Sequence, residues 1–171
     1  MSNKNIRVRV KNILDQLKIT RAPIDPEMIA NYFGIKIQYE PLQGDISGCL
    51  LRDKKDGAII GVNSLHHENR QRFTIAHELG HYLLHKGELT FIDRKFNRIN
   101  FRSGSSASTD DIEEIEANKF AGELLMPEEF LSKDILASDD IEKGDLQEEL
   151  AQKYRVSKQA ITIRLVGLNL T

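Results

Sequence analysis

The sequence predicts an α+β fold, because a strand-rich stretch lies between segments with helical periodicity. Apolar and polar residues alternate at 35–39, and two more strand candidates follow at 46–51 and 58–62. The stretches 5–18 and 72–86 instead repeat apolar residues at helical spacing. We therefore expect a small, mainly antiparallel sheet of about three strands that packs on the helix over 72–86.

Length, charge and cysteine content restrict the class of protein. The 171 residues, 40% of them hydrophobic, suffice for one domain with a core of its own. Lys and Arg number 24 against 26 Asp and Glu, and a net charge of −2 attracts neither nucleic acid nor an anionic membrane. The single cysteine, Cys49, excludes an internal disulfide and fits a reducing compartment. We expect a cytosolic protein without membrane contact, since no apolar run approaches the length of a membrane span.

Two helices are expected before the strands. The first covers 5–18, and its apolar positions are Ile6, Val10, Ile13, Leu14 and Leu17. Asp25 has the character of an N-cap and Pro26 that of a first helical residue, so a short helix should follow and end at Gly34. Between the second and third strands, the polar residues 53–57 predict a hairpin turn.

The helix over 72–86 contains the HExxH motif, formed by His77, Glu78 and His81. Imidazoles four residues apart project from one face of a helix, so both can reach one metal ion. The carboxylate beside the first histidine then lies next to a water bound there, which is the geometry of a zinc hydrolase. The alternative is that both histidines lie on a helix surface without chemistry, but this spacing would arise in only about 1% of shuffled chains.

His85 continues the stripe of His77 and His81 along the same helix face. It lies eight residues after His77, a rise of roughly 12 Å on an unbroken helix, whereas zinc–nitrogen bonds are about 2 Å long. We therefore expect His85 to cap the helix end or to line the cleft rather than to bind the same ion.

A second helix, from about 111 to 126, offers a third ligand. Its buried face consists of Ala117, Phe120, Ala121, Leu124 and Leu125. Glu114 and Asn118 fall beside that face, one turn apart, and polar residues so placed need a partner. Glu113 borders the face from the other edge and is also a possible ligand. Glu116 is expected on the solvated side, which makes it a weak candidate.

Residues 87–110 form the least regular part of the sequence, and their Ser-rich end offers little to bury. We interpret this stretch as a mobile loop, either a lid that grips substrate over the metal or a plain connector. Its basic residues are candidates for contact with an acidic protein surface, namely Arg94, Lys95, Arg98 and Arg102. An extended substrate would add to a strand edge, and 58–62 is the candidate because it is nearest to the HExxH helix in sequence.

The last stretch, 146–171, predicts two short helices with Ser157 as the N-cap of the second. The pattern is similar to a helix-turn-helix, whose second helix enters the major groove of DNA. Its basic residues are Lys153, Arg155, Lys158 and Arg164, a modest excess over nearby acidic residues for binding a phosphate backbone. We favour packing against the rest of the protein over DNA binding. We assign 1–144 to the main domain and 145–171 to a C-terminal helical segment.

In two segments the chain resembles the ImmA/IrrE family of metallopeptidases: His77-Glu-Leu-Gly-His81, and Glu114-Ile-Glu-Ala-Asn118 with the Leu-Leu-Met-Pro that follows. The likeness covers about 23–131. It implies a compact zincin-like metallopeptidase domain of the Glu-zincin type. In such a domain Glu114 would be the third metal ligand and Asn118 would hold His77, since a metal-bound imidazole usually donates its other N–H to an outer oxygen.

The resemblance implies a cytosolic, zinc-dependent metalloendopeptidase that cuts a helix-turn-helix transcriptional repressor, as an anti-repressor of a mobile element or a stress response. The residues agree, because a His, His, Glu site leaves a position for water and Glu78 can carry its proton to the leaving amine. Zinc is the default ion, although manganese or iron(II) also suits these donors. An oxyanion donor is expected as well, and the unranked candidates are Tyr39, His66, His67, His85 and Tyr154.

The alternative is a non-enzymatic regulatory protein with a structural metal site, which binds DNA or a protein partner through its C-terminal helices. A structural zinc site is normally closed by four protein ligands. Only His77, His81 and Glu114 are visible in the sequence. The number of ligands therefore favours the enzyme.

Overall fold

The computed structural model describes residues 2–44, 46–53, 57–85, 91–92, 109–138 and 143–170. By their internal contacts, these residues divide into two compact units. Pro26–Ala121 forms one, which we call the sheet unit, and Met1–Asp25 joins Gly122–Thr171 in the other, the helical unit. The C-terminal helices thus share a unit with the N-terminal helix, whereas the sequence-based boundary lies at residue 144.

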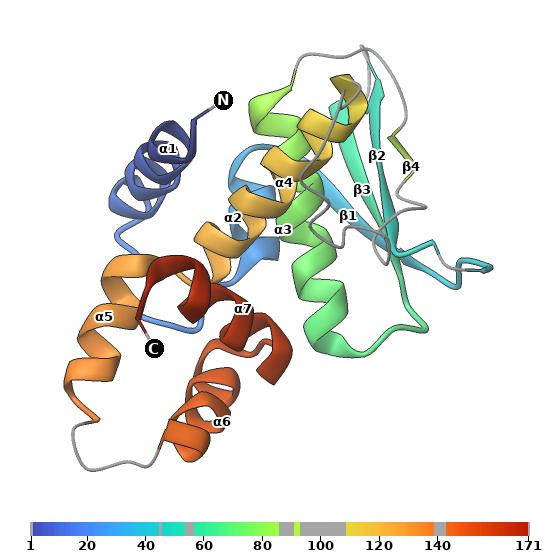
Figure 1. Ribbon diagram of the computed structural model, residues 1–171. Helices are drawn as coiled ribbons and strands as arrows, with labels where there is room; N and C mark the ends of the chain where they lie inside the picture. Colours follow the sequence, from blue (N-terminus) through green and yellow to red (C-terminus); the bar gives the residue numbers. More distant parts are fainter. Residues whose placement is uncertain are drawn as a thin grey trace. The chain divides into compact units, whose positions relative to one another are not determined.

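Figure 1 labels the elements of both units. The sheet unit contains α2 (Pro26–Tyr32), β1 (Ile35–Glu40), β2 (Gly48–Asp53), β3 (Gly57–Asn63), α3 (Glu68–Leu84), β4 (Phe91–Ile92) and most of α4 (Thr109–Leu125). The helical unit contains the end of α4 together with α1 (Asn3–Gln16), α5 (Glu128–Leu136), α6 (Lys143–Tyr154) and α7 (Lys158–Leu168). The α+β fold is confirmed. Among the described residues, no helix combines the length and the apolar character needed to cross a bilayer.

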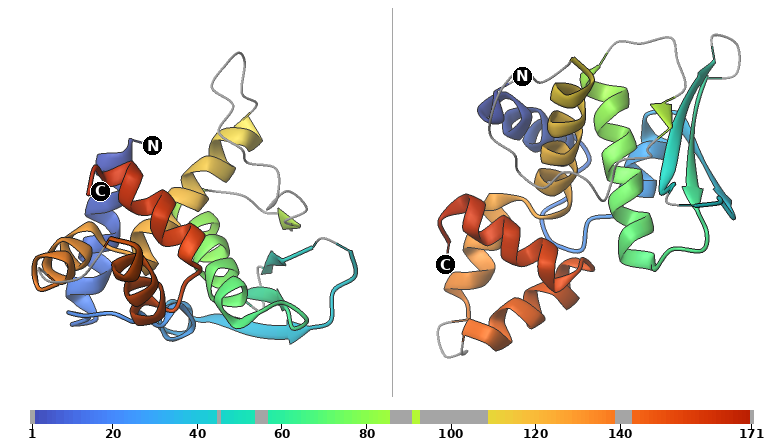
Figure 2. Two further views of the ribbon diagram at one scale, coloured as in Figure 1. Left: turned by 60° about the horizontal axis from the view of Figure 1, so that its bottom comes forward. Right: turned by 45° about the vertical axis from the view of Figure 1, so that its right-hand side comes forward.

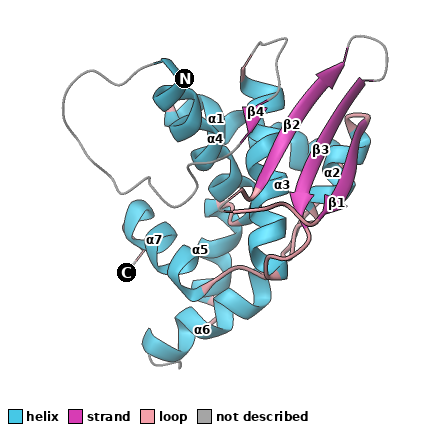
Figure 3. Cartoon of the chain, turned by 90° about the vertical axis from the view of Figure 1, so that its right-hand side faces the viewer, coloured by secondary structure: helices cyan, strands magenta, loops and turns pink. Residues whose placement is uncertain are grey.

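The sheet has the strand order β1-β3-β2-β4 (Figure 3). β2 pairs antiparallel with both β4 and β3. Asp53 lies opposite Gly57, which confirms the predicted hairpin between β2 and β3. Residues 54–56 lie outside the described part. β1 instead runs parallel to β3, with Ile35 opposite Ala58. The sheet is therefore mixed, because β1 pairs with β3 and not with its sequence neighbour β2. A hairpin between sequence neighbours would have been antiparallel.

β3 lies inside the sheet, and its expected role as a docking edge is wrong. Its residues pair with β1 on one side and with β2 on the other. Its backbone groups are therefore used within the protein, and a substrate peptide cannot add to it. Closeness in sequence to the HExxH helix does not determine the position of a strand in the sheet. Of the predicted loop 87–110, only β4 and the first residues of α4 are described, so the lid and its four basic residues lie outside the described residues.

α3 lies between the strands and α4, as the right-hand view of Figure 2 shows. It packs on β2 and β3, where a Cβ placed at Gly48 would lie 2.4 Å from Thr74 Cγ2. It also meets α4, where a Cβ at Gly80 would lie 3.1 Å from the Ala117 Cα. Residues 74–81 are consequently all buried. The histidines in this stretch lie in the interior and not on the exposed face that an amphipathic helix would have.

The helical unit is held together by a buried carboxylate as well as by apolar packing. Glu123, at the end of α4, is 6% exposed and binds Arg164 of α7, whose Nε also donates to the Met126 carbonyl at 3.0 Å. Arg7 of α1 lies 3.7 Å from the same carboxylate. Segments that are distant in the sequence thereby meet at one side chain.

α6 and α7 form the predicted pair of C-terminal helices. Ser157 is the N-cap of α7, and its Oγ accepts a hydrogen bond from the Ala160 N–H at 3.1 Å. Carboxylates of the same unit pair with most of the basic residues considered for DNA binding, in Lys153–Asp134, Lys158–Glu148 and Arg164–Glu123. Charges neutralised in this way contribute little to binding a phosphate backbone, which supports packing within the protein.

Tyr154 provides a test of how the C-terminal helices are held. Its side chain is fully buried, and its hydroxyl donates to Asp134 Oδ2 at 2.7 Å. Burial, together with this hydrogen bond, raises the pKa of Tyr154 well above its ordinary value, so the phenol stays neutral. We expect Tyr154→Phe to lower the free energy of unfolding by about 1.5–3 kcal/mol, measured by urea denaturation, because a hydrogen bond to a carboxylate is lost.

Tyr39→Phe is the matched control for this substitution. The Tyr39 hydroxyl donates to Glu27 Oε2 at 3.0 Å, but in an exposed position. Water replaces such a partner easily, so the free energy of unfolding should change by no more than about 0.5 kcal/mol. An effect of Tyr154→Phe no larger than that of the control would mean that the buried hydroxyl does not hold α6.

Candidate metal centre

The helix that carries HExxH begins and ends at histidines. His67 is the N-cap of α3, and its Nδ1 accepts a hydrogen bond from the Asn69 N–H at 3.2 Å. His85 is the C-cap, and its backbone N–H donates to the His81 carbonyl at 3.1 Å. The expectation that His85 caps the helix end is therefore confirmed.

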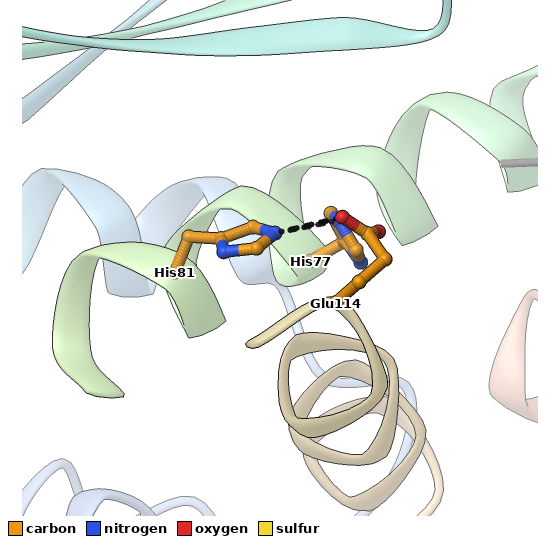
Figure 4. A group of neighbouring side chains, drawn as sticks. All are labelled: His77, His81 and Glu114. Carbon is orange, nitrogen blue, oxygen red and sulfur yellow. Dashed lines mark hydrogen bonds and ion pairs between the residues drawn. The ribbon is translucent and has the colours of Figure 1, made fainter. Parts of the chain in front are cut away.

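His77 and His81 of α3 and Glu114 of α4 point toward one another (Figure 4). The two Nε2 atoms lie 3.0 Å apart, and carboxylate oxygens of Glu114 lie 2.9 Å from His77 Nε2 and 3.5 Å from His81 Nε2. Two atoms bound about 2 Å from one tetrahedral ion are separated by about 3.3 Å. The three side chains are therefore placed as ligands of a single metal ion would be.

Asn118 holds the ring of His77 from the other side. His77 Nδ1 and Asn118 Oδ1 lie 3.1 Å apart. An amide oxygen only accepts hydrogen bonds, so His77 carries its ring proton on Nδ1. In the neutral ring the lone pair is then on Nε2, the atom that faces His81 and Glu114. This is the arrangement that a metal ligand requires.

The ring of His81 is oriented by two further residues. His85 Nε2 lies 3.1 Å from Glu116 Oε2, and an ionised carboxylate only accepts, so His85 is protonated on Nε2. Burial, and next the neighbouring His81, lower the pKa of His85 to about 4, so this ring is neutral and its Nδ1 is an acceptor. His81 Nδ1 lies 3.2 Å from His85 Nδ1 and must donate to it. The Nε2 of His81 therefore also has a lone pair.

The ligand atoms of three side chains thus converge in the interior. Burial alone would raise the pKa of Glu114, but hydrogen bonds and charge from the imidazoles of His77 and His81 lower the pKa below its ordinary value, so the carboxylate is ionised. A cation among these atoms, which a bound metal ion would supply, offsets the negative charge of the carboxylate. Two imidazoles and one carboxylate in a buried position fit a divalent metal ion.

Glu116 was expected on the solvated side of its helix, and this prediction is wrong. Its side chain is buried, at 8% exposure. It lies three positions after Glu113 and four before Phe120, so it shares a helix stripe with both and is carried against α3. Glu113, His81 and His85 form a second group whose ligand atoms lie within 4.8 Å of one another. In that group both ring nitrogens of His85 are already occupied by His81 and Glu116.

Glu78 is adjacent to His77 in sequence and is 1% exposed. Burial raises the pKa of the Cys49 thiol, and the negative charge of Glu78 raises it further. Glu78 therefore lies near Cys49, which β2 carries. Burial of a carboxylate at this position is costly without a functional or structural use.

Two of the residues considered as oxyanion donors, His85 and Tyr154, have partners within the protein. His85 interacts with His81 and Glu116 through its two ring nitrogens. Tyr154 belongs to the helical unit and donates its hydroxyl to Asp134. We therefore assign no catalytic step to either residue.

Arg52 of β2 is a part of this region that sequence reasoning missed. Its Nη2 donates to the carbonyls of His81 and His85 at 2.7 and 2.9 Å, and its guanidinium lies 5.3 Å from the centre of the Tyr82 ring. These contacts attach β2 to the last turn of α3, where carbonyls lack helical partners. No local pattern distinguishes this arginine, because its partners His81 and His85 lie 29 and 33 positions later in the sequence.

An α+β fold with HExxH on one helix and a glutamate on the next defines a metal-binding domain of the zincin-like class. Residues 30–166 match the family model described as the IrrE N-terminal-like domain, and the chain belongs to this family. The resemblance to ImmA/IrrE proteins that the motif segments indicate is thereby confirmed.

Known proteins that are similar to the chain include two curated relatives and one solved structure. Over 128 residues it is 29% identical to "Uncharacterized immunity region protein 2" of Bacillus phage phi105, which covers 75% of this chain and 72% of that protein. Over 92 residues it is 36% identical to Metallopeptidase ImmA of Bacillus subtilis (strain 168), covering 53% and 47%. A Mycobacterium tuberculosis transcriptional regulator shares the fold, with a TM-score of 0.60 and 16% identity over 95% of this chain and 46% of the other. The chain thus spans about half the length of the last two.

Metal analysis of alanine variants tests the ligand set. His77→Ala, His81→Ala and Glu114→Ala should each reduce bound zinc from about one ion per chain to near zero, measured by mass spectrometry after dialysis, because each removes a ligand atom. Glu113→Ala is the control, a neighbouring carboxylate on the same helix. Loss of zinc in Glu113→Ala but not in Glu114→Ala would instead assign the ion to the group of His81, His85 and Glu113.

Proposed function

We propose that the protein is a metal-dependent endopeptidase. The observation that carries the proposal is the convergence of His77 Nε2, His81 Nε2 and the Glu114 carboxylate, with Glu78 on the same helix turn as His77. Three protein ligands leave a position for water or substrate, as in catalytic and not structural zinc sites. The similarity to Metallopeptidase ImmA supports the same activity.

Zinc is the ion we propose, because two histidines and one glutamate are a known ligand set of catalytic zinc. Bound zinc would supply Lewis-acid chemistry, which polarises the scissile carbonyl and makes the attacking water more acidic. The protein prepares for the ion by directing both Nε2 lone pairs, through Asn118 behind His77 and His85 behind His81. Rings held in this way need no reorientation when the ion binds.

Glu78 is the proposed general base. It takes a proton from the attacking water and delivers that proton to the nitrogen of the leaving amine. In the HExxH motif the glutamate next to the first histidine is the general base and not a ligand, and we assign Glu78 this role. The low exposure of Glu78 supports the role, because burial keeps bulk solvent away from the carboxylate.

We further propose that the substrate is a transcriptional repressor with a helix-turn-helix domain, cut in the cytosol. This step depends on the resemblance to the ImmA/IrrE family, and the similarity to a phage immunity region protein supports it. Cleavage would release genes of a mobile element or a stress response. The test substrate is the product of the gene adjacent to the one that encodes this protein.

The exchange Glu78→Gln separates catalysis from metal binding. The amide has the shape of the carboxylate but cannot accept the proton, so the rate of repressor cleavage should fall by about 100-fold or more. Zinc content and melting temperature should remain those of the wild type, because Glu78 is not a ligand. Cleavage is followed by gel electrophoresis of the intact repressor under single-turnover conditions.

An unchanged cleavage rate in Glu78→Gln would overturn the peptidase mechanism. If the wild-type protein bound zinc but cut nothing, and relieved repression in a reporter assay equally well with and without Glu78, the non-enzymatic regulator would be favoured. Glu68→Gln is a suitable control, since Glu68 is an exposed carboxylate in the first turn of the same helix.

A further inference from the structure

A buried hydrogen-bond chain runs from Glu116 through His85 to His81. Its two contacts measure 3.1 Å, from Glu116 Oε2 to His85 Nε2, and 3.2 Å, between the Nδ1 atoms of His85 and His81. The three residues are 8%, 7% and 2% exposed, in the same order. Buried polar groups need specific partners because water cannot replace them, so each contact in the chain constrains the next.

The carboxylate at the end of the chain determines its direction. An ionised carboxylate can only accept, so His85 must donate from Nε2 and accept at Nδ1. His81 must then donate from Nδ1, which leaves the lone pair on Nε2, the atom that faces His77 and Glu114. An uncharged partner in place of Glu116 could donate as well as accept, and the whole chain could then reverse.

Arg52 fixes the same turn of the helix through its backbone. One guanidinium nitrogen donates to the carbonyls of His81 and His85, at 2.7 and 2.9 Å. The two residues joined by the imidazole contact are therefore also held by one side chain from β2. The distance between their rings depends little on fraying of the helix end.

We propose that His85 and Glu116 are positioning residues, which hold His81 in the Nδ1–H tautomer and thereby set the metal affinity of the site. The inference rests on the metal centre of the proposed function. Neither residue touches the ion or the substrate. Removal of an outer partner of a metal-bound histidine typically lowers metal affinity by about 10- to 100-fold.

The alternative use of His85 is as a ligand in the group with His81 and Glu113. That use would require His85 to give up its contact with either His81 or Glu116, because it has two ring nitrogens and both have partners. The hydrogen-bond chain therefore predicts one ion per protein chain, and the ligand group would predict two.

Three substitutions test the chain by zinc titration against a chelator. His85→Leu removes both contacts and should weaken zinc binding by about 10- to 100-fold. His85→Asn retains an acceptor oxygen near the position of Nδ1 and should lose less affinity than His85→Leu. Glu116→Gln has the same shape as the native side chain but permits the reversed chain, so it should also weaken binding.

The matched control is Glu123→Gln, the same exchange at another buried carboxylate of α4. Glu123 interacts with Arg164 in the helical unit, so this variant should keep wild-type zinc affinity even if its melting temperature falls. Melting temperatures of all variants identify any that fail to fold. If His85→Leu is unfolded, Glu116→Gln and His85→Asn decide the question.

Nitrogen-15 chemical shifts of the histidine rings in the metal-free protein give a readout independent of zinc. His81 should be in the Nδ1–H form in the wild type and in Glu123→Gln, and should become partly Nε2–H in His85→Leu and Glu116→Gln. This measurement remains decisive if the wild type binds no zinc, in which case the proposed function fails but the hydrogen-bond chain is still tested.

Two results would overturn the inference. One is an unchanged His81 tautomer with unchanged zinc affinity in both His85→Leu and Glu116→Gln. The other is binding of two ions by the wild type, with loss of one of them in His85→Leu and in Glu113→Ala and no effect on the other. That second result would make His85 a ligand.

Discussion

The crossing of α3 and α4 without a side chain between them is the constraint on which the metal centre depends. A Cβ at Gly80 would lie 3.1 Å from the Ala117 Cα, so the two helix backbones are almost in contact. His77 and Glu114 each lie three residues before this point of close approach, and His77 Nε2 lies 2.9 Å from Glu114 Oε1. A larger residue at position 80 would push α3 and α4 apart, and His77 would then move away from Glu114.

Close packing on both sides of α3 also explains why its polar residues are so completely partnered. His77, His81 and His85 are buried where solvent cannot satisfy their rings, so the protein supplies Asn118 and Glu116. An ion that binds only the folded protein stabilises it, and at a free concentration 100 times its Kd such an ion adds about 2.7 kcal/mol. Folding therefore assembles the ligands in advance of the ion.

Local features of the sequence were sufficient for the helices and for placing His77 and His81 on one helix face, because helical periodicity describes positions within a few residues of each other. Periodicity left both Glu113 and Glu114 as possible ligands, and the resemblance to the ImmA/IrrE family selected Glu114 and Asn118. The parallel pairing of β1, the burial of Glu116 and the role of Arg52 depend on which distant segments meet. Periodicity within one element carries no information about such contacts, and Glu116 was misplaced because its helix is covered on more than one side.

The helical unit combines residues 1–25 with residues 122–171, so it cannot form until most of the chain has left the ribosome. Every residue of the sheet unit, with all three metal ligands, has been made once residue 121 is added, before α5, α6 and α7 exist. α1 must wait for those partners with its apolar residues uncovered, namely Ile6, Val10, Ile13 and Leu14. At about 5–20 residues per second, the roughly 100 residues between α1 and α5 take about 5–20 s to translate. Nascent chains can therefore acquire the metal first, while their N-terminal helix is a target for chaperones.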